Sequence, residues 1–84
     1  MPTKWRDAPF TDYQIHKIAL GETGEETGET YNYYLYVNLR GQALIMREKS
    51  DSTEFKYANG GFVGSSLQWT NRTTLSYVYY NKVS

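Results

Sequence analysis

Four glutamates in a stretch rich in glycine and threonine are the first residues that could do chemistry. The stretch GETGEETGET, residues 21–30, carries Glu22, Glu25, Glu26 and Glu29 and no basic residue. Calcium takes six to eight oxygen ligands, but its known loops place aspartate or asparagine at alternate positions and end on a bidentate glutamate. This stretch lacks that spacing. We therefore expect a flexible, solvated connection between two strands, with an acidic tongue against a basic partner surface as the alternative.

Catalysis would need a convergent set of polar side chains, and the chain offers few of them. His16 is the sole histidine and there is no cysteine, which excludes thiol nucleophiles and the usual zinc ligand sets. No serine or aspartate pattern around His16 suggests a triad. Asp7, Asp12 and Glu54 could form a carboxylate pair only if folding brought two of them together. The sequence predicts a protein that is not an enzyme and takes no cofactor.

Nine tyrosines among 84 residues point to recognition instead. Tyrosine is enriched at protein interfaces because it combines a large rigid ring with a polar tip. It also stacks on bases and sugars, so glycan or single-stranded nucleic acid must be weighed, as must plain sheet surface with cross-strand pairs. We predict an interface formed by outward-facing residues of the sheet together with aromatic residues near the N-terminus, namely Trp5, Phe10, Tyr34, Tyr36, Val78 and Tyr80.

The chain length, the composition and the net charge limit the partners of this chain. Eighty-four residues suffice for one small domain with a single core. Small domains are often stabilised by disulfides, metal ions or association with other chains. Since no disulfide can form and the usual zinc ligands are missing, we expect association with other chains to stabilise this domain. The formal net charge of zero argues against nucleic acid. No stretch approaches the length of a membrane span, and the N-terminal residues lack the apolar run of a signal peptide.

Apolar residues recur at every second position over much of the chain from residue 31 onward, which is the period of a strand. In YNYYLYVNL, residues 31–39, one side carries Tyr31, Tyr33, Leu35, Val37 and Leu39, and Tyr34 and Tyr36 face the other way. QALIMREK reads as a strand buried on both faces from Ala43 to Met46. Further strands are expected at EFKYA, at TTLSYVYYNKV and, in preference to a helix, at residues 13–20.

The connections carry turn signals. Asn38–Gly41 suits a type I turn followed by a left-handed glycine. Residues 50–53 and Asn59-Gly60-Gly61 are predicted to be further turns. Residues 62–72 are expected to form a packed loop pinned by Trp69 and holding one helical turn.

Five strands with short connections predict an all-β fold. We expect a small antiparallel meander that closes into a sandwich or an open barrel. Residues 1–12 are predicted to be an N-terminal arm that lies across the sheet or reaches a neighbouring chain. Residues 13–84 would form the single β domain, with the flexible acidic loop at 21–30.

The stretch GQALIMREKSDSTEFKYANGG, followed by WTNRTTLSYVYYNKV, resembles short segments of small β-rich structural proteins in tailed bacteriophage virions. The resemblance covers residues 40–83 and includes no functional signature. It implies a multi-copy head, neck or tail component that is assembled in the bacterial host cytoplasm. Its partners would then be copies of itself and other virion proteins, and no catalytic residue can be carried over.

The sequence thus leads to a non-enzymatic structural protein of a phage particle that acts through protein–protein contacts. The rival hypothesis is a glycan- or ligand-binding β module, with Tyr34, Tyr36, Trp69 and Tyr80 as stacking surfaces.

Overall fold

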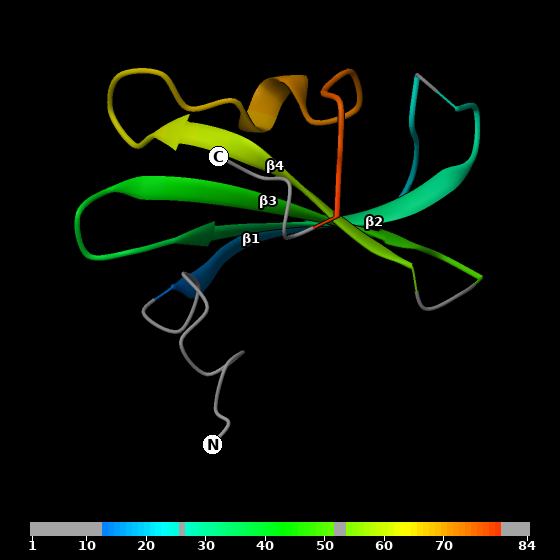
Figure 1. Ribbon diagram of the computed structural model, residues 1–84, viewed down its shortest axis with the longest axis horizontal. Helices are drawn as coiled ribbons and strands as arrows, with labels where there is room; N and C mark the ends of the chain where they lie inside the picture. Colours follow the sequence, from blue (N-terminus) through cyan, green and yellow to red (C-terminus); the bar gives the residue numbers. More distant parts are fainter. Residues whose placement is uncertain (1–12, 26, 52–53, 80–84) are drawn as a thin grey trace.

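The chain forms one antiparallel sheet with its strands in sequential order, β1-β2-β3-β4. The computed structural model describes residues 13–25, 27–51 and 54–79. The elements are β1 (Gln14–Thr23), β2 (Thr30–Val37), β3 (Gln42–Lys49), β4 (Phe55–Phe62) and the 3-10 helix η2 (Trp69–Asn71) (Figure 1). The predicted all-β antiparallel meander is confirmed, and the helix considered for residues 13–20 is excluded because β1 begins at Gln14 and runs through the rest of that stretch.

The predicted fifth strand, residues 73–83, is reduced to a single bridge within the described residues. Val78 and Tyr57 of β4 exchange backbone hydrogen bonds of 2.9 and 2.7 Å. Residues 72–74 form a turn instead, because Thr74 donates both its N–H and its hydroxyl to the carbonyl of Asn71. Threonine hydroxyls that bond nearby backbone compete with strand formation. The part of the chain that the structure describes holds one open sheet, so neither a second sheet nor barrel closure is seen there.

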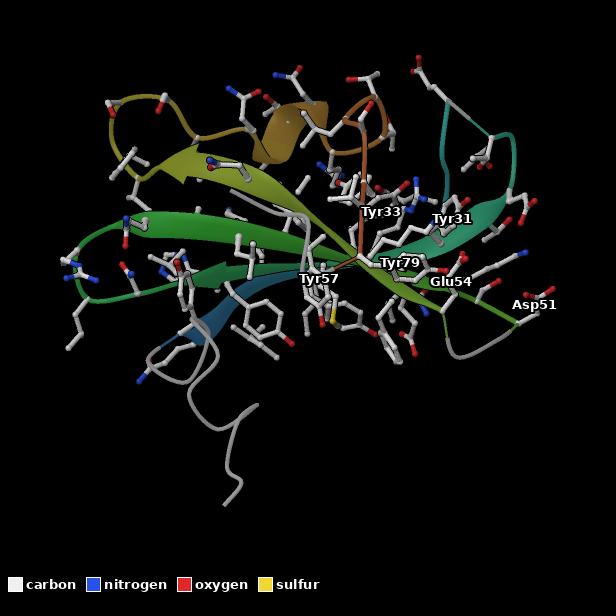
Figure 2. All side chains as sticks on the ribbon, in the orientation of Figure 1. Tyr31, Tyr33, Asp51, Glu54, Tyr57 and Tyr79 are labelled. Atoms are coloured by element: carbon white, nitrogen blue, oxygen red, sulfur yellow. The ribbon has the colours of Figure 1, made fainter. Side chains whose placement is uncertain are left out.

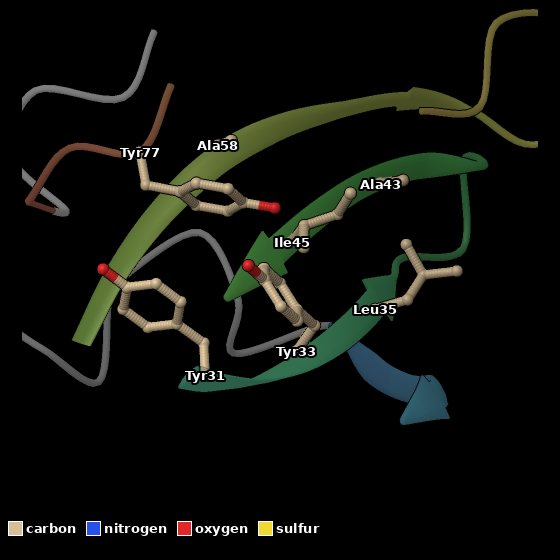
Figure 3. Close-up of a cluster of buried hydrophobic side chains, with 7 residues drawn as sticks. All are labelled: Tyr31, Tyr33, Leu35, Ala43, Ile45, Ala58 and Tyr77. Carbon is tan, nitrogen blue, oxygen red and sulfur yellow. The ribbon is translucent and has the colours of Figure 1, made fainter. Parts of the chain in front are cut away.

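Alternation along β2 and β3 builds the core on one face of the sheet. Tyr33 and Leu35 on β2 and Ile45 on β3 are fully buried; the two β2 residues share one side of their strand, as predicted. Leu39 was expected on the same side but is 95% exposed, because β2 ends at Val37 and Leu39 lies in the turn beyond it. Figure 3 shows the whole cluster, which comprises Tyr31, Tyr33, Leu35, Ala43, Ile45, Ala58 and Tyr77.

The segment after β4 covers this core. Leu67, Trp69 and Leu75 pack against the cluster, and the hydroxyl of Tyr77 donates to the carbonyl of Arg72 at 2.8 Å. Figure 1 shows the segment, yellow to orange, along one side of the sheet beside β4. The predicted loop, with Trp69 packed inward and one helical turn, is confirmed. We call residues 63–77 the covering segment.

The two glycine-containing turn signals have different outcomes. Gly41 has a φ of 83° and closes the β2–β3 turn by donating its N–H to the carbonyl of Asn38, as predicted. Asn59-Gly60-Gly61 is not a turn, because β4 continues through it to Phe62. There the register shifts by one residue opposite Ala43 and Leu44, and Gly61 has a φ of 81°. Asparagine followed by glycine therefore supplies a β-bulge, which uses the same left-handed backbone as a hairpin turn.

The acidic stretch is shorter than predicted, because β1 runs past Gly21 to Thr23 and β2 begins at Thr30. The connection is therefore confined to residues 24–29. It is held by backbone hydrogen bonds from Gly24 to Glu29 and from Glu25 to Thr73 of the covering segment. Its flexibility stays a prediction.

Candidate interaction surface

The sheet face opposite the core carries a continuous apolar stripe, and we call this side the outer face. In an antiparallel ladder, directly paired residues point to the same side. The central row runs across the whole sheet, through Ile18, Tyr34, Met46, Tyr57 and Val78. The adjacent row is Ile15, Tyr36, Leu44 and Asn59. Figure 2 shows Tyr57 on the side of the sheet away from Tyr31 and Tyr33.

The structure brings three of the predicted interface residues together on this face. Tyr34 and Tyr36 lie on β2, and Val78 reaches the same side through its bridge to β4. Tyr34 and Tyr36 are half-buried and Val78 is 37% exposed. The other predicted interface residues, Trp5, Phe10 and Tyr80, lie outside the described residues.

The outer face carries little charge. On β2, β3 and β4 its one charged side chain is Glu48, whose Oε1 accepts hydrogen bonds from the Tyr34 hydroxyl at 2.7 Å and from Asn32 Nδ2 at 3.3 Å. The hydrogen bond to Glu48 raises the pKa of Tyr34 above its ordinary value, so the phenol stays protonated as a donor. The face is therefore suited to an apolar or neutral partner more than to a charged one.

The most exposed apolar residues of β1 were not predicted as interface residues. Ile15, Ile18 and Leu20 are 51%, 53% and 65% exposed, and we call these three residues the β1 rim. Within the described residues the outer edge of β1 pairs with no other strand. The sequence signal was the broken alternation at residues 13–20. Register shifts between Ile15 and Lys17 and between Ala19 and Glu22 place Ile15 and Ile18 on one face although they are three residues apart.

The aromatic residues proposed for glycan stacking do not form one platform. Trp69 belongs to the covering segment and packs against the core, with the Arg72 guanidinium 4.5 Å from its ring centre. Tyr34 and Tyr36 lie on the outer face, on the other side of the sheet. A sugar stacked on these two tyrosines would not reach Trp69.

Two glutamates of the acidic stretch, Glu22 and Glu29, have side-chain partners. Glu22 binds Arg72, and Glu29 forms a salt bridge of 2.7 Å with Lys49. In the described part of the chain, no group of three or more potential metal ligands comes together. Glu22 therefore connects β1 to the covering segment, and Glu29 connects the loop after β1 to β3.

Two of the candidate catalytic residues, His16 and Glu54, lie among the described residues. His16 is exposed on β1, and Asp7 and Asp12 lie outside the described residues. Glu54 accepts a hydrogen bond of 3.2 Å from the Tyr79 hydroxyl and lies 3.8 Å from Lys56 Nζ (Figure 2).

Within residues 13–25, 27–51 and 54–79, no helix is long and apolar enough to cross a membrane.

Comparison with protein-family models, with curated proteins and with solved structures gave no match.

Proposed function

We propose that this protein is a non-enzymatic structural component of a phage particle, a head-decoration, neck or tail protein that acts through protein–protein contacts. The observation that carries the proposal is the β1 rim, where three large apolar side chains are at least half exposed on an edge strand. Exposed apolar patches of this kind mark contact sites. The resemblance of residues 40–83 to virion proteins supports the assignment to a phage particle.

The geometry of β1 indicates how such a contact would form. An edge strand offers unpaired backbone groups to which another strand can bind. Two bulges interrupt the ten residues of β1, so a continuous added strand would lose its register at each of them. We infer that side-chain packing on Ile15, Ile18 and Leu20 provides most of the contact, with backbone pairing limited to short segments.

The test compares two full-length variants that each place a charge on an exposed apolar residue. Ile18→Glu changes the β1 rim, whereas Leu39→Glu changes the turn between β2 and β3, which is not part of the rim. Native mass spectrometry and light scattering over a wide concentration range should show a defined oligomer for the wild type and for Leu39→Glu. For Ile18→Glu we expect the oligomer to dissociate at protein concentrations at least about tenfold higher than those at which the wild type dissociates, since a buried unpaired charge costs more than 1 kcal/mol.

Mass spectrometry of purified virions provides the second arm of this test. The proposal predicts that the protein is found in the particles. A strictly monomeric wild type that is also missing from the particles would contradict it. If the two substitutions changed the dissociation of the oligomer equally, the β1 rim would not be the contact surface.

A further inference from the structure

Arg47 is a buried cation that forms no salt bridge with a carboxylate of the described residues. It is 5% exposed, and its guanidinium lies 4.1 Å from the ring centre of Tyr31 and 4.6 Å from that of Tyr77. The faces of the rings attract the positive charge, but oxygen atoms are the usual acceptors for the N–H groups in the guanidinium plane. Because buried charges in proteins are normally paired and hydrogen-bonded, Arg47 has the character of half of an ion pair.

The nearest basic neighbours of Arg47 already have carboxylate partners. Lys49 lies two positions further along β3, and Lys56 is the cross-strand partner of Arg47 on β4, so all three point to the core side of the sheet. Lys49 binds Glu29 at 2.7 Å, and Lys56 lies 3.8 Å from Glu54. Among these three cations, the most buried one is therefore the one whose charge no described carboxylate balances.

The Tyr33 hydroxyl is a second donor beside this charge. Tyr33 is the cross-strand partner of Arg47 on β2, and its ring centre lies 6.0 Å from that of Tyr31 and 5.9 Å from that of Tyr77 (Figure 3). Its hydroxyl is fully buried and has no hydrogen-bond partner in the described structure. Burial raises the pKa of Tyr33 above its ordinary value, so this hydroxyl is protonated at neutral pH and can donate.

We propose that Arg47 and the Tyr33 hydroxyl form a binding site for a small tetrahedral oxyanion of the phosphate or sulfate type. A guanidinium presents two parallel N–H groups that match two oxygens of such an ion, and a neighbouring hydroxyl can donate to a third oxygen. The negative charge of the ion balances that of Arg47. Because the two ring contacts hold the guanidinium in place before the ion arrives, little ordering accompanies binding.

Burial favours a small ion over a larger ligand. Tyr33 is fully buried and Arg47 retains 5% exposure, so a ligand of many atoms cannot contact both donors. In the described structure no guanidinium nitrogen is both fully buried and unpartnered, and the ion can therefore approach from solvent at Arg47. The site uses β2, β3 and the covering segment but no residue of the β1 rim, so it does not depend on the proposed function.

The test is an NMR titration of the full-length protein with inorganic phosphate, in sodium chloride at constant ionic strength. We expect a saturable shift of the Arg47 Nε–H signal and of the Tyr33 ring signals. Arg72 is the control within the same molecule, because Glu22 already binds its Nε and Nη2. The Arg72 Nε–H signal should therefore stay in place. Sulfate should compete with phosphate for the site, and the order of their affinities identifies which of the two ions it prefers.

Three variants assign the donors. Tyr33→Phe keeps the ring and should weaken phosphate binding about tenfold, since hydrogen bonds to charged groups are among the stronger ones. Arg47→Met should abolish the shift of the Tyr33 ring. Lys49→Met removes a neighbouring charge that already has a partner and should change the affinity by no more than about threefold. Circular dichroism shows which variants fold, and if Arg47→Met does not, the comparison of Tyr33→Phe with Lys49→Met decides.

Several results would contradict the proposed oxyanion site. No saturation by about 10 mM phosphate would place any dissociation constant above the millimolar range. Equal shifts of Arg47 and Arg72, or equal responses to phosphate and to added chloride, would indicate a general effect of salt. Unchanged binding by Tyr33→Phe would exclude the hydroxyl as a donor. None of these results alters the expected effect of Ile18→Glu on the oligomer, so the two proposals fail independently.

Discussion

The Arg72 guanidinium binds both carboxylate oxygens of Glu22, Nε to Oε1 at 2.8 Å and Nη2 to Oε2 at 2.9 Å. Its Nη1 also donates to the carbonyl of Trp69 at 2.9 Å. Fifty residues separate Glu22 from Arg72 in the sequence. This one side chain therefore joins the end of the edge strand β1 to the segment that covers the core.

Glu22→Gln should destabilise the protein while Glu29→Gln should not. Both substitutions are isosteric and lie in the acidic stretch, but Glu22 forms a two-pronged contact and Glu29 a single exposed one with Lys49. Bidentate arginine–carboxylate pairs are the stronger kind, so we expect Glu22→Gln to cost about 1 kcal/mol of unfolding free energy. Urea unfolding at low and high salt measures both variants. Equal midpoints would contradict the assigned difference.

The side-chain partners of these glutamates could not be predicted from the sequence. The spacing of the glutamates differs from that of the known calcium-binding loops. The same spacing could not show that Glu22 belongs to a strand and Glu29 to a connection, because Gly21 read as a strand end. Pairing with Arg72 depends on the path of the covering segment, which no local pattern in the sequence contains.

Tyr33→Phe and Tyr77→Phe should have opposite effects. The Tyr33 hydroxyl is buried without a hydrogen-bond partner in the described structure, whereas that of Tyr77 donates to the Arg72 carbonyl. Removing an unsatisfied hydroxyl relieves a desolvation cost, so Tyr33→Phe should be neutral or stabilising by up to about 1 kcal/mol. Tyr77→Phe should be destabilising by about 1 kcal/mol, because the carbonyl loses its donor. Thermal and urea unfolding of both variants provide the measurement, and a destabilised Tyr33→Phe would contradict this account.

Stability should fall in alkaline solution. Burial raises the pKa of Tyr77 and of Tyr33, although the nearby Arg47 guanidinium acts to lower both. In the unfolded chain these phenols ionise near pH 10, so above that pH unfolding releases protons that the folded state retains. The unfolding free energy should therefore be unaffected by these tyrosines below about pH 10 and decrease above it. Urea titrations from pH 8 to pH 11.5 test this, with Tyr77→Phe expected to show a shallower decrease.

Periodicity predicted the inner strands well but did not identify every buried residue on them. QALIMREK matches β3 residue for residue, and Tyr31, Tyr33 and Leu35 face the core as expected. Arg47 on the same face is 5% exposed, with its guanidinium 4.1 Å from the ring centre of Tyr31 and 4.6 Å from that of Tyr77. The alternating pattern does not reveal that this arginine is buried between two rings, because the rings come from other parts of the chain.

Gly61→Ala should be far more damaging than Gly64→Ala. Both glycines have a positive φ, 81° and 88°, so alanine is strained at either position. A Cβ on Gly61 would collide with the backbone carbonyl of Ser66, whereas nothing lies within 4 Å of a Cβ on Gly64. From backbone strain alone, we expect Gly64→Ala to lower the unfolding free energy by about 1 kcal/mol. For Gly61→Ala we expect a loss of roughly 3 kcal/mol or more, because the Ser66 carbonyl belongs to a turn that is closed by a hydrogen bond to Phe62. Chemical unfolding and native-state hydrogen exchange on β4 measure the difference, and equal costs would show that the bulge at Asn59–Gly61 moves freely enough to accept a side chain.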